Sequence, residues 1–116
     1  MATLKQRGDF INVTAPTGGY TVGDVIVVGT LVGVVQETVD AGELVGVDVE
    51  RVYSITKQAT SDTYSQGDEV YVDDSTGEAY TADATGRSYA GICWADSANG
   101  DTGVEVGLNK MTPTAT

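Results

Sequence analysis

The chain contains the stretch Tyr20-Thr-Val-Gly-Asp-Val-Ile-Val-Val28, which recurs in modified form as Tyr64-Ser-Gln-Gly-Asp-Glu-Val-Tyr-Val72. Each copy opens with Tyr-x-x-Gly-Asp and continues into apolar residues. Two further elements follow each copy in the same order, a glycine-broken apolar run and a Gly-Val-acid-Val segment: 31–34 and 46–49 in the first half, 90–92 and 103–106 in the second. This order predicts a chain built from two related β units.

The apolar residues alternate with other residues at a period of two, which is the pattern of a half-buried strand. In 69–73 and 104–108, valine or leucine alternates with acidic, aromatic or glycine residues. No stretch of useful length shows the 3.6-residue spacing of a helix, and 15 glycines punctuate the chain. We therefore expect an all-β fold, a compact antiparallel β-barrel or sandwich of about seven to nine short strands.

Particular segments refine the expected strands. Val25–Val28 is continuously apolar, which predicts burial on both of its faces. Residues 47–56 are expected to form one longer strand with a bend at Glu50-Arg51. A hairpin turn is predicted at 74–77. The two Gly-Asp pairs predict tight strand-entry turns, because glycine tolerates positive φ and aspartate caps neighbouring amides.

The length of 116 residues predicts one β domain with short terminal extensions. We place the domain at 17–110, an extended N-terminal arm at 1–16 and a C-terminal tail at 111–116. The arm joins a basic start to an apolar patch, and its candidate contact residues are Lys5, Arg7, Phe10, Ile11 and Val13. A neighbouring chain is the expected partner of this arm.

The charge of the chain limits its partners. Six basic residues stand against 17 acidic ones, for a net charge of −11, and the basic residues are scattered. Contact with DNA needs clustered Lys and Arg, so we expect neither nucleic acid nor an anionic membrane as a partner. No apolar run is long enough to span a bilayer. We expect a protein that is made and kept in solution.

Reactive groups are scarce. The chain has no histidine, which excludes the usual general base and every Ser-His-Asp or Cys-His arrangement. It also lacks a GxxxxGK[ST] loop, which excludes a conventional ATPase. The single cysteine, Cys93, lies in an apolar setting and is expected to be a small buried residue. We expect no catalytic residue, no cofactor and no metal site.

The aromatic residues allow more than one interpretation. Tyr20 and Tyr64 hold equivalent places in the two copies, and we expect their rings to cover the following turn with the hydroxyls near solvent. Trp94 is either a core anchor or an interface anchor, with the core favoured. The aspartates around 73–78 and 96–101 are expected in solvated turns, and calcium binding is the main alternative for them.

Several ordered segments carry a family resemblance: 31–34, 41–42, 52–57, 67–73, Gly91, 100–101 and 104–109. Through them the chain, from about residue 8 to residue 109, resembles a family of small tailed-phage proteins. These were formerly labelled as predicted RecA/RadA-type recombinases and are now regarded as capsid cement or decoration proteins. The recombinase label finds no support in this sequence, which has neither a phosphate loop nor a basic face for DNA.

The resemblance implies a structural virion protein and not an enzyme. It implies a compact β domain that is made in the host cytoplasm and binds the major capsid protein at the outer capsid surface, often as a trimer. The arm would then lie on the capsid or on a neighbouring subunit. Burial of apolar surface at many such sites would stabilise the shell against internal pressure.

Two other functions are open at this point. A displayed β module could bind a small molecule, calcium or a carbohydrate through the loops 73–78 and 96–101. An enzyme could use a pair of carboxylates, but the missing histidine and the lack of a pocket signature make this the least favoured reading.

Overall fold

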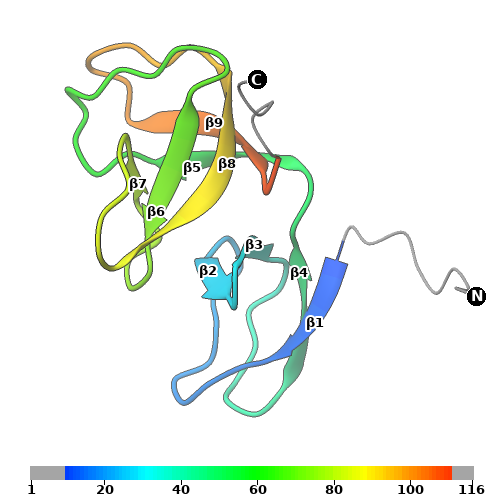
Figure 1. The fold of residues 1–116 in the computed structure, drawn as a ribbon. Coiled ribbons are helices and arrows are strands. Elements are labelled where there is room, and N and C mark those ends of the chain that lie inside the picture. The colour runs from blue at the N-terminus through cyan, green and yellow to red at the C-terminus, as the bar shows by residue number, and fades with distance from the viewer. Residues whose placement is uncertain (1–9, 111–116) are drawn as a thin grey trace, which may run out of the picture.

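The computed structural model describes residues 10–110, which form nine strands and no helix (Figure 1). The strands are β1 (Phe10–Thr14), β2 (Val25–Val28), β3 (Leu31–Val35), β4 (Leu44–Asp48), β5 (Val52–Thr56), β6 (Glu69–Asp73), β7 (Ala79–Tyr80), β8 (Arg87–Ala95) and β9 (Gly103–Leu108). This part of the chain accordingly contains no helix that could cross a membrane.

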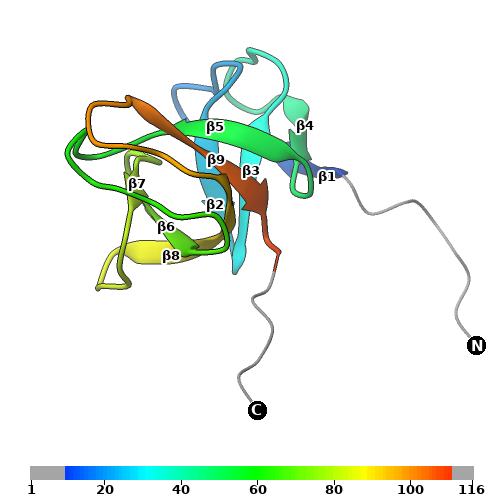
Figure 2. The ribbon, with the colours of Figure 1, turned by 90° about the horizontal axis from the view of Figure 1, so that it is seen from above.

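The strands form two antiparallel sheets, one from each half of the chain. The first is four-stranded with the order β1-β4-β3-β2, and the second is five-stranded with the order β5-β9-β8-β6-β7. Figure 1 shows the first sheet below the second, and Figure 2 shows β5 and β9 crossing over β2 and β3. The predicted all-β fold and its strand number are confirmed, as a sandwich of two sheets and not a closed barrel.

The doubled sequence pattern corresponds to a doubled backbone geometry. The amide of Gly23 donates to the carbonyl of Val35 at 2.8 Å, and the amide of Gly67 donates to the carbonyl of Cys93 at the same 2.8 Å. Both glycines have positive φ, 91° and 95°. The two strand-entry turns are therefore equivalent, as predicted. The first turn is bonded to β3 and the second to β8, and each of these strands is third in the order of its sheet.

The other members of the repeated motif also match. The Asp24 carboxylate accepts from the amide of Thr21 at 2.9 Å, and the Asp68 carboxylate accepts from the amide of Ser65 at 2.8 Å. Each motif tyrosine forms an isolated antiparallel bridge, one with Val39 and the other with Ser97. Aspartate and glycine thus recur because each copy builds the same capped turn.

The last element of the repeat does not match as the sequence pattern predicted, because the structurally equivalent segments differ by two residues from the predicted pair 46–49 and 103–106. Val47 lies opposite Val35, and Val106 lies opposite Cys93. Segment 46–49 is therefore equivalent to 105–108 and not to 103–106. A shift of two residues keeps every side chain on its original face, so the alternation of valines could not reveal it.

The main core lies between the two sheets. From β3, Val32 and Val34 pack against the inner face of the second sheet. The other buried members are Ile55, Tyr64, Val70, Val72, Ala79, Ala90, Cys93, Val104, Val106 and Leu108. Tyr64 is the only aromatic residue among these buried members, and most of the others are valines. The core therefore consists mainly of branched aliphatic side chains, which suit a pleated sheet.

A second cluster lies on the other face of the first sheet. It contains Val35, Val45, Val47 and Val49, with Ile11 and Val13 packed against it. Strand β2 serves both clusters: Val25 and Val27 contact the main core, and Ile26 contacts the second cluster. The predicted burial of this strand on both faces is confirmed, although its side chains are only half-buried.

The predicted long strand over 47–56 is wrong, because the chain leaves one sheet and enters the other within it. Asp48 is fully buried, and its Oδ1 accepts from the amides of Glu50 at 2.9 Å and Arg51 at 3.2 Å. Its Oδ2 accepts from the hydroxyl of Tyr53 at 2.7 Å. The carboxylate takes up amides that a continuous strand would have used in its ladder, so β4 ends here and β5 begins in the other sheet.

Asn109 joins the two sheets at the end of β9. Its Oδ1 accepts from the amide of Val32 at 3.0 Å, and its Nδ2 donates to the carbonyls of Val32 at 2.8 Å and Val49 at 2.7 Å. Its own amide donates to the carbonyl of Ala90 at 2.7 Å. Its φ of 54° is the left-handed conformation that asparagine tolerates better than most residues.

Tyr64 differs from its predicted role. It is 3% exposed, and its hydroxyl is buried without a hydrogen-bond partner in the described part of the chain. Burial, with the nearby charges of Asp62 and Cys93, raises the pKa of this hydroxyl to about 12. The predicted solvent contact of the hydroxyl is wrong, because the ring is held inside the main core.

The predicted arm at 1–16 contains a strand of the first sheet. Strand β1 pairs with β4 along its whole length, from Phe10 opposite Asp48 to Thr14 opposite Leu44. Residues 1–9 and the predicted tail at 111–116 lie outside the described residues.

Replacing Asn109 should uncouple the sheets. We expect Asn109→Gly, which keeps the positive φ, to lower the free energy of unfolding by about 2–4 kcal/mol, because it leaves strand-end backbone groups of Val32 and Val49 without partners. Urea unfolding followed by Trp94 fluorescence measures this. The exposed Asn99→Gly is the matched control and should change stability by less than about 1 kcal/mol. Equal effects of the two variants would contradict the linking role.

Asp48 should make stability depend on pH. Burial alone would raise the pKa of this carboxyl, but hydrogen bonds from Glu50, Tyr53 and Arg51 outweigh it and hold the pKa below the ordinary value of 3.8. The stabilisation is therefore present above the unfolded pKa and is lost as the pH falls through the lower folded pKa.

The variant Asp48→Asn removes this titration. We expect it to cost about 1–3 kcal/mol at neutral pH, with the gap to the wild type narrowing once the pH falls below about 4. Denaturant unfolding at a series of pH values checks both points. Asp40→Asn, an exposed aspartate of the first half, is the control. A gap that stays constant down to the acid limit would contradict the assignment.

Candidate functional site

Strand β1 leaves one edge of the first sheet open. It pairs with β4 on one side, and no described residue forms a backbone hydrogen bond with its other side. Its sequence, Phe-Ile-Asn-Val-Thr, has strong β propensity and contains neither charge nor proline. Natural proteins usually protect such edges because an exposed one can pair with another chain. The β1 edge is thus a candidate contact surface.

The structure separates the predicted contact residues. Ile11 and Val13 pack against the second core cluster, so their side chains stabilise the domain itself. Phe10 lies on the opposite face of β1 and is half-buried, with the Arg51 guanidinium 5.1 Å from its ring centroid. Lys5 and Arg7 lie outside the described residues. Of the three candidate contact residues that the structure describes, only Phe10 lies outside the second core cluster.

Trp94 lies on the outer face of the second sheet. It is 48% exposed, and its ring covers Gly107, where an added Cβ would come within 2.7 Å of the ring. Val52, paired with Gly107, is 38% exposed beside it. The favoured core position of Trp94 is wrong, because the preceding Cys93 points inward at 1% exposure and successive side chains of a strand alternate. The sequence contained a signal for this exposure, because Cys93 was predicted to be buried and the alternation of a strand then places the next side chain, Trp94, on the outer face.

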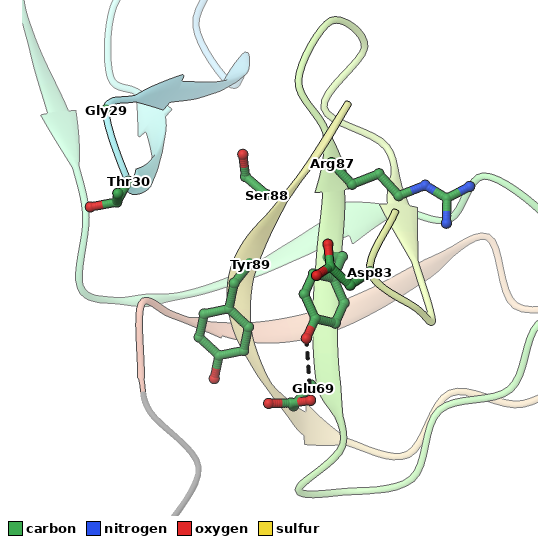
Figure 3. A pocket seen from close by; sticks show the side chains of 8 residues that line it. Gly29, Thr30, Glu69, Asp83, Arg87, Ser88 and Tyr89 are labelled. Atoms are coloured by element: carbon green, nitrogen blue, oxygen red, sulfur yellow. Dashed lines mark hydrogen bonds between the residues drawn. The ribbon is translucent and has the colours of Figure 1, made fainter. Parts of the chain in front are cut away.

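A groove separates the turn after β2 from the second sheet. It has a volume of about 520 Å³ and is lined by Gly29, Thr30, Glu69, Tyr71, Asp83, Arg87, Ser88 and Tyr89 (Figure 3). The rings of Tyr71 and Tyr89 meet edge to face, with centroids 5.7 Å apart and planes at 71°. The Tyr71 hydroxyl donates to the Glu69 carboxylate at 3.3 Å.

The charge around the groove is negative. Burial, followed by the charge and hydrogen bond of Glu69 and the charge of Asp83, raises the pKa of the Tyr71 hydroxyl. Among the described residues that line it, the one cation is Arg87, which stacks on Tyr80 at 3.6 Å from the ring centroid and donates to the carbonyl of Ala82 at 3.0 Å. Figure 3 shows the Arg87 guanidinium pointing away from Tyr89.

The sequence alone did not predict this groove. The tyrosines come from different strands, and the irregular register between Val70 and Tyr71 brings Tyr71 opposite Tyr89. No local motif carries that information, because a bulge depends on the pairing of distant segments.

In each of the loops at 73–78 and 96–101, one aspartate caps backbone amides of its own loop. Asp73 Oδ1 accepts from the amides of Ser75 at 2.7 Å and Thr76 at 3.0 Å, and these bonds lower the pKa of its carboxyl. Asp101 accepts from the amide of Ala98 at 2.9 Å. Over residues 10–110, no group of three or more His, Cys, Asp or Glu residues is arranged to hold a metal ion.

Lys57 holds the second of these loops in place. It is only 3% exposed, and its ammonium donates to the carbonyls of Asp62 at 2.7 Å and Ala98 at 3.0 Å and to Ser97 Oγ at 3.1 Å. These three acceptors satisfy all three donors of the ammonium. The loop is therefore a rigid structural unit, and the lysine has a structural role.

Comparison with known proteins identifies the family. A family model described as phage cement protein matches residues 5–108, which include all nine strands and the candidate β1 edge. No curated protein and no solved structure matches the chain. The family is one of structural proteins of the phage capsid and not an enzyme family. The chain therefore belongs to the phage cement protein family, with a structural role in association with the capsid.

Proposed function

We propose that this protein binds the major capsid protein at the outer surface of the phage capsid and stabilises the shell. The observation that carries the proposal is the open, uncharged edge of β1 in a protein of a capsid-associated family. A capsid strand that pairs with this edge would gain main-chain hydrogen bonds without needing a particular sequence. Phe10 and the preceding Lys5 and Arg7 would add side-chain contacts at the same place.

The charge of the chain supports the outer surface over the inner one. The interior of a filled capsid presents densely packed phosphates, and this chain carries a net charge of −11. Like charges repel over several ångströms at physiological salt. An acidic face is compatible with solvent on the outside, and the two basic residues before β1 would lie at the attachment point.

The rigidity of the domain supports a cement role. The first sheet is tied to the second by the shared core and by Asn109. A strand held this way loses little additional conformational entropy when a partner binds it. Pairing at many copies would then resist separation of the capsid subunits.

We further propose that the copies associate as trimers through the patch formed by Val52 and Trp94. Exposed tryptophan is enriched at the centre of protein interfaces. The patch lies on the second sheet, whereas the β1 edge belongs to the first sheet.

Pairing at the β1 edge is tested with capsids that lack this protein. We expect the wild type to pellet with them and Asn12→Lys, an exposed charge on β1, to bind at least about tenfold more weakly, because lysine disfavours pairing at a strand edge. Thr56→Lys, at an exposed end of β5, is the matched control and should bind like the wild type. Wild-type binding by Asn12→Lys would remove the β1 edge from the interface.

Sealed, DNA-filled heads distinguish the two surfaces of the shell. Protein added from outside should bind them and raise the temperature at which they release DNA. Failure to bind sealed heads, with binding to opened shells, would place the site inside and overturn the proposal. Failure to bind either preparation would rule out the cement role.

The oligomer is tested separately by sedimentation. We expect Trp94→Ser to shift the protein from trimer toward monomer, because the ring supplies most of the apolar area of the patch. Val22→Ser, which changes an apolar residue 57% exposed in the first half, should leave the trimer intact. A wild type that is monomeric at high concentration, both free and on the capsid, would contradict the trimer.

A further inference from the structure

We propose that the groove beside β6 and β8 binds an ammonium group, held against the rings of Tyr71 and Tyr89 and neutralised by Glu69 and Asp83 (Figure 3). This inference is separate from capsid attachment through β1, since none of the residues lining the groove belongs to β1.

The arrangement of the rings suits a cation. Two rings at 71° form a corner, and a cation in such a corner can face the negative π surface of one ring while touching the other. A flat saccharide face would instead call for a flat aromatic platform. The irregular register between Val70 and Tyr71 creates the corner, because it places Tyr71 opposite Tyr89 across the β6–β8 pair.

The carboxylates favour the same ligand. Glu69 and Asp83 are both exposed, line the groove and act on the Tyr71 hydroxyl. They can accept hydrogen bonds from an ammonium and supply opposite charge to it. A phosphate or carboxylate ligand would meet repulsion from both. Arg87 does not neutralise the tyrosine corner, because its guanidinium is stacked on Tyr80 and bonded to Ala82.

The size of the groove sets the scale of the ligand. A volume of about 520 Å³ falls within the range of small-molecule sites, roughly 300–1,000 Å³. It admits a quaternary ammonium or a lysine side chain with neighbouring atoms. The ammonium could come from a free organic amine or from Lys5 of a second copy, which lies in a basic segment outside the described residues.

Titration with choline tests the site. We expect choline to shift the ring resonances of Tyr71 and Tyr89 in a saturable manner, and 3,3-dimethylbutan-1-ol, its neutral isostere, to bind at least about fivefold more weakly, as expected for a cation at an aromatic face. Sodium chloride at equal ionic strength should not shift these resonances. Equal binding of choline and the neutral isostere would overturn the proposal, as would no saturable shift by choline.

Paired variants assign the residues. The double variant Glu69→Gln, Asp83→Asn should weaken choline binding about three- to tenfold, whereas Glu105→Gln, Asp40→Asn removes the same charge from exposed sites outside the groove and should have less effect. Tyr71→Leu should weaken binding, and Tyr71→Phe, which keeps the ring, should restore it. Equal losses of choline affinity in the two double variants would show that only the net charge of the protein matters, and would overturn the proposed site.

A peptide of residues 1–9 with an acetylated N-terminus, in which Lys5 is the only ammonium, distinguishes the sources. If it shifts the same resonances and its Lys5→Gln form does not, the groove takes a lysine from another copy. If choline binds and neither peptide does, the ligand is a free organic amine. If the Lys5→Gln peptide binds as well as the natural one, recognition in the groove does not depend on ammonium, and the proposal fails.

Discussion

The three side-chain hydrogen bonds of Asn109 to Val32 and Val49 hold the two halves of this protein together. Each half is a small antiparallel sheet that could not bury both of its faces alone. Val32 and Val34 enter the core of the second sheet, and Asn109 satisfies the backbone of β3 at the point where that strand meets the end of β9. The shared core and the polar link act at the same place. The position of every surface feature relative to the others depends on this junction.

The functional features arise where the two related halves differ. Strands β5 and β1 hold equivalent places in the two sheets: β5 pairs with β9, the last strand of the second half, and β1 pairs with β4, the last strand of the first half. Both are edge strands, but the residue after β5, Lys57, forms a bridge with Ala79 of β7, whereas no described residue forms a backbone hydrogen bond with the free side of β1. The groove has a similar origin, since an irregular register in the β6–β8 pair aligns two tyrosines that have no counterpart in the first half. A duplicated framework thus carries two distinct surfaces.

Much of the fold could be predicted because its signals are local. The Gly-Asp turns, the alternation in 69–73 and the hairpin at 74–77 each depend on neighbouring residues, and the structure has all three. The candidate site was less predictable. Ile11 and Val13 pack against the domain, and Trp94 is exposed because Cys93 takes the inward place. An apolar side chain is buried in the core if a distant strand covers its face of the sheet, and is exposed for contact with a partner if none does. A single sequence does not show directly which face is covered.

The sequence by itself determined the all-β class, the two-unit plan, the acidic surface and the absence of histidine chemistry, because composition and short-range periodicity fix these properties. Through its ordered segments it also pointed to the cement family, and the family match over residues 5–108 bears this out. Only the tertiary structure decided where the chain crosses between sheets, which strands lie at the sheet edges and which aromatic rings meet. The crossing between the sheets involves polar side chains such as Asp48 and Asn109, whose partners lie in other strands or across a chain crossing. Pairing between distant segments carries that part of the information.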